Sequence, residues 1–191
     1  MQRDTERRAG RSLRGDLLDA AAELITRSGY RGVRMQDIAD AAGVSRQTVY
    51  NEFGDKMGLT RALMLRDHEH YLDGVDEALS RHDDLHSAVA AAVAYSLQTA
   101  ADDPFKKAVL TGAGSEDLLP LFTTQAEPML FSARTRIIEH VIRHWPELDR
   151  EAVTELVDAA VRLTLSHVLL PAQPAEQVAE LIARIVTRYL G

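Results

Sequence analysis

Three consecutive side chains at positions 46–48 carry hydrogen-bonding groups that can distinguish one nucleic-acid base from another. Arg46 can donate two parallel hydrogen bonds to guanine, and Gln47 can pair in the same way with adenine. Ser45, directly before them, is a favoured residue at a helix N-terminus. The order Ser45-Arg46-Gln47-Thr48 therefore predicts a short helix whose first turn presents donors and acceptors to base edges, as recognition helices do in the major groove.

Two further helices are predicted to hold this recognition helix in place. Apolar residues recur at helical spacing over residues 12–28, which end at Gly29, and a second short stripe covers residues 34–42. Gly43 separates that stripe from the helix predicted over residues 45–51, where a tight turn needs a left-handed backbone that glycine adopts without strain. Two short helices joined by a glycine turn and packed on a longer helix form a helix-turn-helix unit.

Charge is distributed unevenly along the 191 residues. The whole chain has a net charge of −7, which by itself disfavours binding to a polyanion. Residues 1–66, however, contain 12 Lys and Arg against 9 Asp and Glu, whereas residues 67–191 contain 10 against 20. An N-terminal part of charge +3 on a remainder of charge −10 is expected if only one end of the molecule contacts an anion such as DNA.

A longer pattern surrounds the predicted recognition helix. It consists of IADAAGVS at residues 38–45 and TVYNEFGDK at residues 48–56. With its Ile-Ala pair, Gly-Val-Ser turn, Tyr-x-x-Phe ending and Lys at the next helix start, the pattern is similar to the DNA-binding domain of the TetR family. The resemblance covers residues 13–65 and implies binding to double-stranded DNA at a palindromic operator. The residues that would contact DNA are Arg34, Ser45, Arg46, Gln47, Thr48, Tyr50, Asn51 and Lys56.

Two positions differ from the family pattern. Family members often have Ser or Thr immediately before the second helix, whereas this chain has Val33-Arg34, so that Arg34 would have to take over a phosphate contact. Glu52 stands where a basic residue or His is common. An acidic side chain there either accepts a hydrogen bond from a cytosine amino group or points away from DNA.

Beyond Arg66 the sequence predicts helices throughout, so the fold class is all-α. The resemblance implies an N-terminal three-helix helix-turn-helix domain and a C-terminal helical ligand-binding and dimerisation domain, predicted at residues 1–55 and 56–191. Residues 1–11 are predicted to form a disordered arm, and a long helix beginning at Asp55 would join the domains rigidly. The expected helical segments are 59–81, 86–101, 105–111, 128–145, 150–170 and 175–190.

The last two predicted helices carry broad apolar stripes. A second apolar face on one helix needs another partner, and the resemblance implies a twofold-related copy that forms a four-helix interface. Packing within one chain is the alternative. A homodimer would place two recognition helices about 34–36 Å apart, or a multiple of that distance. The predicted interface residues are Val157, Val161, Leu165, Val168, Leu181 and Ile185.

The middle helices are the predicted site of a small molecule. Aromatic and methionine side chains there would line a cavity for a hydrophobic effector, with Gln98 and His167 as polar contacts in otherwise apolar helices. Plain core packing is the alternative for each residue. By analogy with the family, binding would move the helix after Asp55 and release the operator. The predicted ligand-binding residues are Tyr71, Tyr95, Gln98, Phe105, Phe122, Met129, Phe131 and His167.

Other classes of function find little support in the sequence. The chain has no cysteine, which excludes disulfides, thiolate zinc sites and cysteine nucleophiles. His82 and His86 could share a helix face, but no further ligand joins them, so neither a metal nor another cofactor is predicted. Residues 112–115 lack the strand and Lys of a P-loop. We therefore predict a cytoplasmic repressor without a membrane segment. A DNA-binding regulator that needs no ligand is the second hypothesis, and an all-α enzyme is the third.

Overall fold

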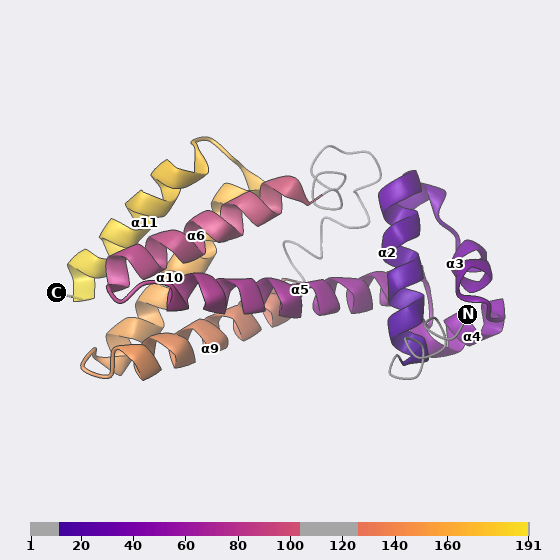
Figure 1. Ribbon diagram of the computed structural model, residues 1–191, viewed down its shortest axis with the longest axis horizontal. Helices are drawn as coiled ribbons and strands as arrows, with labels where there is room; N and C mark the ends of the chain where they lie inside the picture. Colours follow the sequence, from indigo (N-terminus) through magenta and orange to yellow (C-terminus); the bar gives the residue numbers. More distant parts are fainter. Residues whose placement is uncertain (1–11, 104–125, 191) are drawn as a thin grey trace, which may run out of the picture.

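The computed structural model describes residues 12–103 and 126–190, and these residues form eight α-helices and no strand. A small N-terminal unit lies at one end of the molecule, and the long helix α5 runs from it into a larger helical unit (Figure 1). The predicted arm at 1–11 and the predicted helix at 105–111 lie outside the described residues. The helices are α2 (Leu13–Gly32), α3 (Met35–Ala42), α4 (Arg46–Phe53), α5 (Lys56–Ser80), α6 (Leu85–Asp102), α9 (Glu127–His144), α10 (Arg150–Leu169) and α11 (Ala175–Leu190).

The N-terminal unit, here called the head, consists of α2, α3, α4 and the first turns of α5. It has an apolar core of its own, in which Leu17 of α2, Ile38 of α3 and Val49 of α4 are almost completely buried. Leu59 and Leu63 of α5 belong to the same core. The beginning of α5 is therefore part of the head in packing terms, and the domain boundary that we propose lies within α5.

The predicted end of the first helix at Gly29 needs a correction. Gly29 has a left-handed φ of 70° and kinks the chain, but helical backbone resumes after it and continues to Gly32. The kink lets the side chain of Tyr30 tuck into the head, where it is buried. Burial of that ring favours the extra turn, and the helical periodicity before Gly29 contains no signal for it.

Side chains fix where the helices begin. Ser45 accepts a hydrogen bond from the backbone N–H of Thr48 at 3.1 Å, and Asp55 accepts one from Gly58 at 2.7 Å. These side chains satisfy N–H groups that the first turn of a helix leaves unpaired. The capping residues across the described chain are Ser12, Ser45, Asp55, Asp84 and Asp149.

The turn between α4 and α5 leaves no room for a side chain at Gly58. A Cβ built there would overlap the carbonyl oxygen of Phe53, which is held within the backbone. Gly58→Ala is therefore expected to lower the free energy of unfolding by about 1–3 kcal/mol. Gly15→Ala is the matched control, because its Cβ would lie 3.4 Å from the Ser12 hydroxyl in ordinary contact. There alanine is expected to raise the free energy by up to about 1 kcal/mol. Denaturant unfolding of both variants measures the difference, and equal effects would contradict it.

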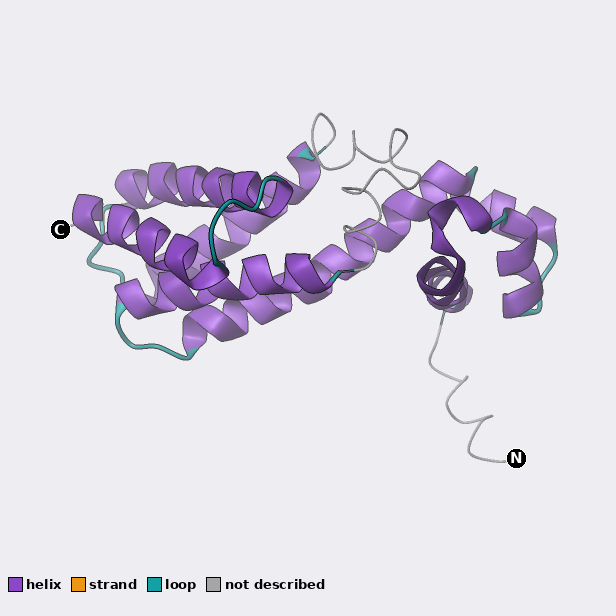
Figure 2. Cartoon of the chain, turned by 90° about the horizontal axis from the view of Figure 1, so that it is seen from above, coloured by secondary structure: helices purple, strands orange, loops and turns teal. Residues whose placement is uncertain are grey.

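The larger unit, here called the body, consists of the rest of α5 with α6, α9, α10 and α11. Helix α6 packs along α11 and α5, while α9 packs along α10 (Figures 1 and 2). Apolar side chains on the inner faces form three buried clusters rather than one continuous core. Within residues 12–103 and 126–190, no helix combines the length and the hydropathy that a bilayer span requires.

Polar side chains join α5 to α9. Arg136 of α9 bonds to Asp73 and Asp76 of α5, and His140, one turn further along, lies 3.6 Å from the other oxygen of Asp76. Only 4% of His140 is exposed, and its ring stacks on that of His144. Burial lowers the pKa of His140, and the positive charge that His144 can carry lowers it further, although Asp76 acts in the opposite direction. The native protein therefore favours neutral His140.

Stability is expected to depend on pH through this histidine. An unfolded His takes up a proton near pH 6.5, whereas native His140 takes it up only at lower pH, so stability falls as the pH drops below about 6.5. One such group contributes a slope of at most about 1.4 kcal/mol per pH unit. The loss between about pH 7.5 and about pH 5.5 should be smaller in His140→Asn, which denaturant unfolding can measure. Identical losses in the two proteins would contradict this prediction.

Candidate nucleic-acid interface and ligand cavity

Helix α4 presents a row of polar side chains on the exposed side of the head. Arg46 donates a hydrogen bond to the Tyr50 hydroxyl at 3.0 Å, and its guanidinium lies over the Tyr50 ring. Gln47 donates to the side-chain oxygen of Asn51 at 2.8 Å. Each pair spans one helical turn, so the partners hold one another on the same face. Arg46, Gln47 and Asn51 are exposed, and Tyr50 is half-buried.

The turn before α4 has the geometry that the sequence predicted. Gly43 has a φ of 70° and a ψ of 33°, which is the left-handed conformation that favours glycine. Val49 and Phe53 of α4 are buried in the core of the head, as expected for packing residues. The hydroxyls of Ser45 and Thr48 lie 2.8 Å apart, next to the exposed N–H end of the helix. This end of α4 combines a positive helix terminus with hydroxyl groups, an arrangement suited to phosphate contact.

The structure shows what Glu52 and Arg34, the two residues that depart from the family pattern, contact. The carboxylate of Glu52 accepts a hydrogen bond from Arg14 of α2 at 2.8 Å, so its charge is paired within the head. This arrangement corresponds to the predicted alternative in which Glu52 does not read a base. Arg34 caps α3 through its backbone N–H, which donates to the Asp37 carboxylate at 2.7 Å, and the rest of the residue is exposed.

Lys56 is directed inward. Its ammonium donates a hydrogen bond to the Tyr30 carbonyl at 2.6 Å and lies 4.2 Å from the centre of the Tyr30 ring. Burial lowers the pKa of Lys56, although nearby Asp37 opposes that effect. The geometry therefore favours a positioning role, which ties the start of α5 to the end of α2, over the predicted contact with phosphate.

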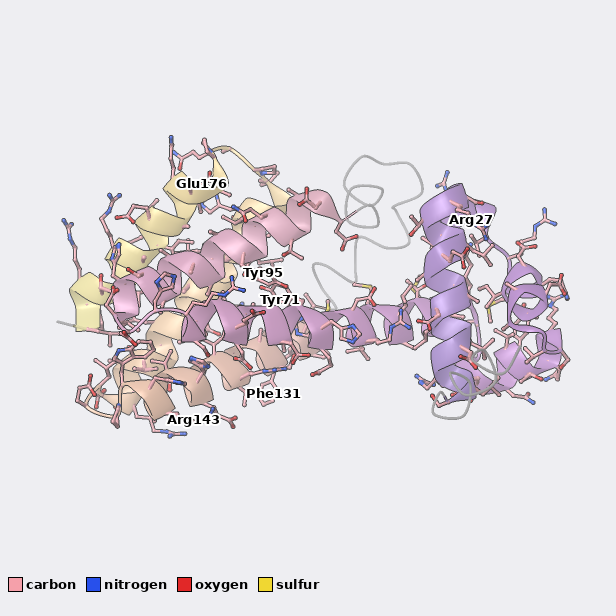
Figure 3. All side chains as sticks on the ribbon, viewed as in Figure 1. Arg27, Tyr71, Tyr95, Phe131, Arg143 and Glu176 are labelled. Atoms are coloured by element: carbon pink, nitrogen blue, oxygen red, sulfur yellow. The ribbon has the colours of Figure 1, made fainter. Side chains whose placement is uncertain are left out.

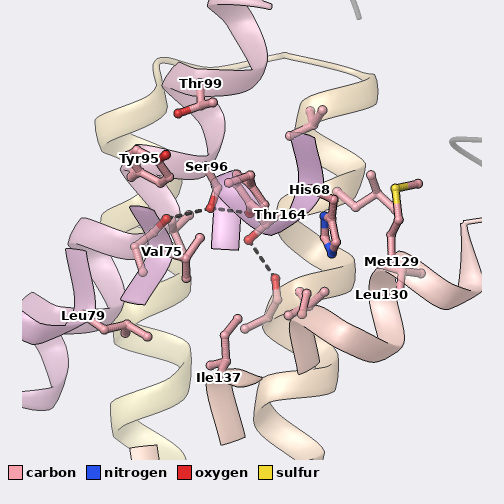
Figure 4. A pocket seen from close by; sticks show the side chains of 18 of the residues that line it. His68, Val75, Leu79, Tyr95, Ser96, Thr99, Met129, Leu130, Ile137 and Thr164 are labelled. Carbon is pink, nitrogen blue, oxygen red and sulfur yellow. Dashed lines mark hydrogen bonds between the residues drawn. The ribbon is translucent and has the colours of Figure 1, made fainter. Parts of the chain in front are cut away.

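A cavity of about 810 Å³ lies inside the body and reaches the head. Its walls come from α5, α6, α9, α10 and α11, and Ala22, Ile25 and Thr26 of α2 also line it. Most of the lining is aliphatic, with a few hydroxyl groups near the middle (Figure 4). A cavity of this size and polarity is suited to a hydrophobic small molecule.

The predicted ligand-binding residues divide into three groups. Tyr71, Tyr95 and Met129 line the cavity, and the two tyrosine rings are stacked between α5 and α6 (Figure 3). Gln98, Phe131 and His167 do not line it, which corrects the prediction for them. Gln98 is exposed and bonds to Glu176 of α11 at 3.3 Å, 59% of Phe131 is exposed on α9, and His167 is half-buried outside the lining. Phe105 and Phe122 lie outside the described residues.

Sequence reasoning missed several lining residues that carry polar groups. Ser96 of α6, Thr164 of α10 and His68 of α5 all line the cavity. Ser and Thr in helices of alternating small and apolar residues give no periodic signal, because both residue types also occur on solvated faces. The contribution of α2 was also missed, since only the tertiary structure brings the head to the cavity.

The predicted dimer residues also separate into two sets. Val157, Val161, Leu165 and Val168 of α10 line the cavity within one chain, so their place at an interface stays a prediction. Leu181 and Ile185 of α11 are 38% and 44% exposed, and Tyr189, one turn further on, is 65% exposed. These three form a row on the outer face of α11. The neighbouring α10 presents Leu163, which is also exposed.

Comparison with known proteins gives this arrangement a family. Residues 17–63 match the family model described as "Bacterial regulatory proteins, tetR family", and residues 84–188 match "Bacterial Tetracyclin repressor, C-terminal domain". The chain is also 33% identical over 178 residues to the HTH-type transcriptional regulator AlkX of Mycobacterium tuberculosis, covering 93% of this chain and 84% of that protein. The chain belongs to the TetR family of transcriptional regulators.

A solved structure extends this similarity to the whole fold. The structure of the TetR family repressor AlkX from Dietzia sp. strain DQ12-45-1b, described as implicated in biodegradation of n-alkanes, has a TM-score of 0.78. It is 26% identical and covers 92% of this chain and 96% of its own. The all-α TetR fold predicted from sequence is therefore confirmed, and the matched domains belong to transcriptional regulators rather than enzymes. TetR-family regulators bind DNA and are dimers.

A shorter match is to a regulator of different output. Over 80 residues the chain is 39% identical to the HTH-type transcriptional activator FasR of Mycolicibacterium smegmatis. The matched stretch covers 42% of this TetR-family chain and 36% of FasR. The chain thus spans only about a third of FasR's length in this match. A match over 80 residues carries no information on whether this chain represses or activates.

Proposed function

We propose that this TetR-family regulator is a homodimeric repressor that is released from a palindromic operator by a hydrophobic small molecule. The observation that carries the proposal is the cavity of about 810 Å³, whose walls include residues of both the body and the head. Similarity to the AlkX repressor of Dietzia supports repression rather than activation. Because its target is operator DNA, we place its action in the cytoplasm.

The DNA-binding part of the proposal rests on the exposed face of α4. Arg46 and Gln47 have the donor geometry for guanine and adenine edges. Ser45, Thr48, Tyr50 and Asn51 are placed to contact phosphates or bases from the same helix, with Arg34 at the start of α3. The paired charge of Glu52 removes the repulsion that a free carboxylate would exert on phosphate.

Release of DNA is proposed to work through α5. This helix contributes Leu59 and Leu63 to the head core, and its later turns contribute Tyr71, Val75 and Leu79 to the cavity. An effector that fits the cavity better in one orientation of α5 would shift the population toward that orientation. Since the head moves with the start of α5, the spacing between the two heads of a dimer would no longer match the operator.

The test combines DNA binding with effector release. Fluorescence anisotropy on DNA from upstream of the protein's own gene, over a salt series, is expected to show tight binding that weakens steeply with salt and is absent for scrambled DNA. Hydrophobic compounds that raise the unfolding temperature should then lower the DNA affinity. Sequence-specific binding that no stabilising compound reverses would favour the ligand-independent regulator instead.

A further inference from the structure

The cavity shares residues with the core of the head. Ile25 of α2 and Leu63 of α5 are buried members of that core, and both also line the cavity. Ala22 and Met64 are half-buried, pack against the same core and line the cavity as well. A small molecule in this part of the cavity would therefore contact side chains that hold the DNA-binding head together.

The cavity extends along α5 from the head into the body. Its lining on this helix includes one residue per turn, in the order Leu63, Asp67, Tyr71, Val75 and Leu79. Leu63 and Leu79 belong to one continuous helix, so they lie about 24 Å apart along its axis. Leu63 is in the core of the head, whereas Leu79 is in a cluster formed by residues of the body. A guest that reaches from Leu79 to the head must therefore be long.

Helix α2 is joined to the recognition helix by continuous packing. The Lys56 ammonium bonds to the Tyr30 carbonyl at 2.6 Å, and Arg66 bonds to Asp19 at 2.7 Å, so two polar contacts tie α2 to α5. Helix α2 also packs on α3, and α3 packs on α4. A force on α2 is therefore transmitted to α4 and to the first turns of α5 together.

Polar side chains in the cavity leave the polar end of a guest open. Asp67 lies 3.4 Å from the guanidinium of Arg66, and His68 bonds to the Ser132 hydroxyl at 2.9 Å. His70 also lines the cavity, so groups of both signs of charge face it. A hydroxyl and a carboxylate are both compatible with such a wall. The length of the cavity is thus a sharper guide to the guest than its charge.

We propose that the effector is a long-chain aliphatic molecule that releases DNA by contacting α2 directly, and that shorter chains bind in the same cavity without releasing DNA. This inference deepens the proposed function and rests on it, because it names the contact through which the same cavity acts. A guest shifts the balance between two orientations of the head only if it binds them with different affinity. A chain that ends short of Ile25 and Thr26 makes the same contacts in both orientations, whereas a chain that reaches them does not.

The experiment measures binding and release separately along a series of chain lengths. Alkan-1-ols and alkanoates from octyl to hexadecyl, delivered from cyclodextrin below their micellar concentrations, are titrated into the full-length protein by calorimetry. The same probes are titrated into its complex with operator DNA, and release is followed by anisotropy. Two head groups are used so that a preference for one of them does not decide the outcome.

Binding and release are expected to depend differently on length. Affinity for the protein should rise steadily along the series, because each added methylene buries more apolar surface. At saturating concentration, octyl chains should leave the operator affinity within about twofold of its value without a probe. Hexadecyl chains should lower it roughly tenfold or more, which is within the usual range of coupling between two sites.

A matched pair of variants on α2 locates the contact. Thr26 is exposed and lines the cavity, so a phenyl ring at this position brings α2 closer to the end of a bound chain. Thr26→Phe is therefore expected to let shorter chains release DNA than the unmodified protein does. Ser28→Phe is the control, because Ser28 is exposed on the same helix but does not line the cavity. The control should keep the length threshold of the unmodified protein, and equal unfolding temperatures would show that both variants are folded.

The outcomes separate this inference from the proposed function. Release that parallels binding at every chain length, or the same length threshold in both variants, would overturn the role of α2 while leaving an effector that acts through α5. Chains that all bind without any release of DNA would overturn the role of α2 and also effector release in the proposed function. Failure of every chain to bind would overturn the long-chain effector and remove the support for a hydrophobic one.

Discussion

Replacing Arg46 and Gln47 together with alanine is expected to weaken binding to the operator by roughly 100-fold at fixed salt. Both side chains are exposed on the first turn of α4, and each is held there by a partner one turn further along, Tyr50 or Asn51. A side chain that pairs with a base edge contributes about 1–3 kcal/mol of discrimination, so loss of two such contacts also reduces the preference for operator over scrambled DNA. Anisotropy on both DNAs measures affinity and preference.

The control for this variant removes an equivalent pair elsewhere in the head. Arg27 and Glu23 also lie one turn apart on an exposed helix face, in α2, and form an ion pair at 3.5 Å. Replacing both with alanine should leave the operator affinity almost unchanged. Equal affinities for the α4 variant and the α2 variant would mean that α4 does not read DNA, provided that both unfold at the temperature of the unmodified protein.

Charging the outer face of α11 is the change with the second large expected effect. In Leu181→Glu with Ile185→Glu, two carboxylates occupy an exposed apolar row, while the buried face of the helix, which carries Ile182 and Val186, stays intact. If this row is the twofold interface, the variant is a folded monomer. Operator affinity then falls by about 10²–10⁴-fold, because the second half-site is no longer bound by a linked head.

Sedimentation and anisotropy on the same samples test this prediction. Phe131→Glu is the control, because it charges another exposed apolar residue, on α9, away from α11. We expect Phe131→Glu to remain dimeric and to bind the operator normally. A dimer that survives the α11 variant and dissociates in the control would place the interface on α9 instead.

The head could be predicted well because its signals are local. Ser45 and Asp55 cap helices within three residues of themselves, and Gly43 adopts a left-handed turn that few other residues tolerate. Such features depend on bonds between near neighbours in the chain. Helix positions in the body were also predicted closely, since the apolar periodicity is carried by each segment on its own.

Which face of a body helix points inward could not be predicted in the same way. Helix α10 is apolar on more than one side, so periodicity alone does not separate the cavity residues Val157 and Leu165 from the exposed Leu163. The decision depends on where α6 and α9 lie, and those helices are distant in sequence. The same reason explains why Gln98 was predicted in the cavity and lies beside Glu176 instead.

By itself, the sequence determined the all-α class, the helix-turn-helix and the identity of the residues that α4 exposes, because caps, turns and periodicity act over a few residues. Only the tertiary structure decided that Glu52 is paired by Arg14 and that Lys56 bonds to the carbonyl of Tyr30, contacts that join residues 38 and 26 positions apart. It also decided that one cavity contacts body and head together. These contacts and the shared cavity depend on packing between segments that are distant in sequence, and patterns within a few residues cannot predict such packing.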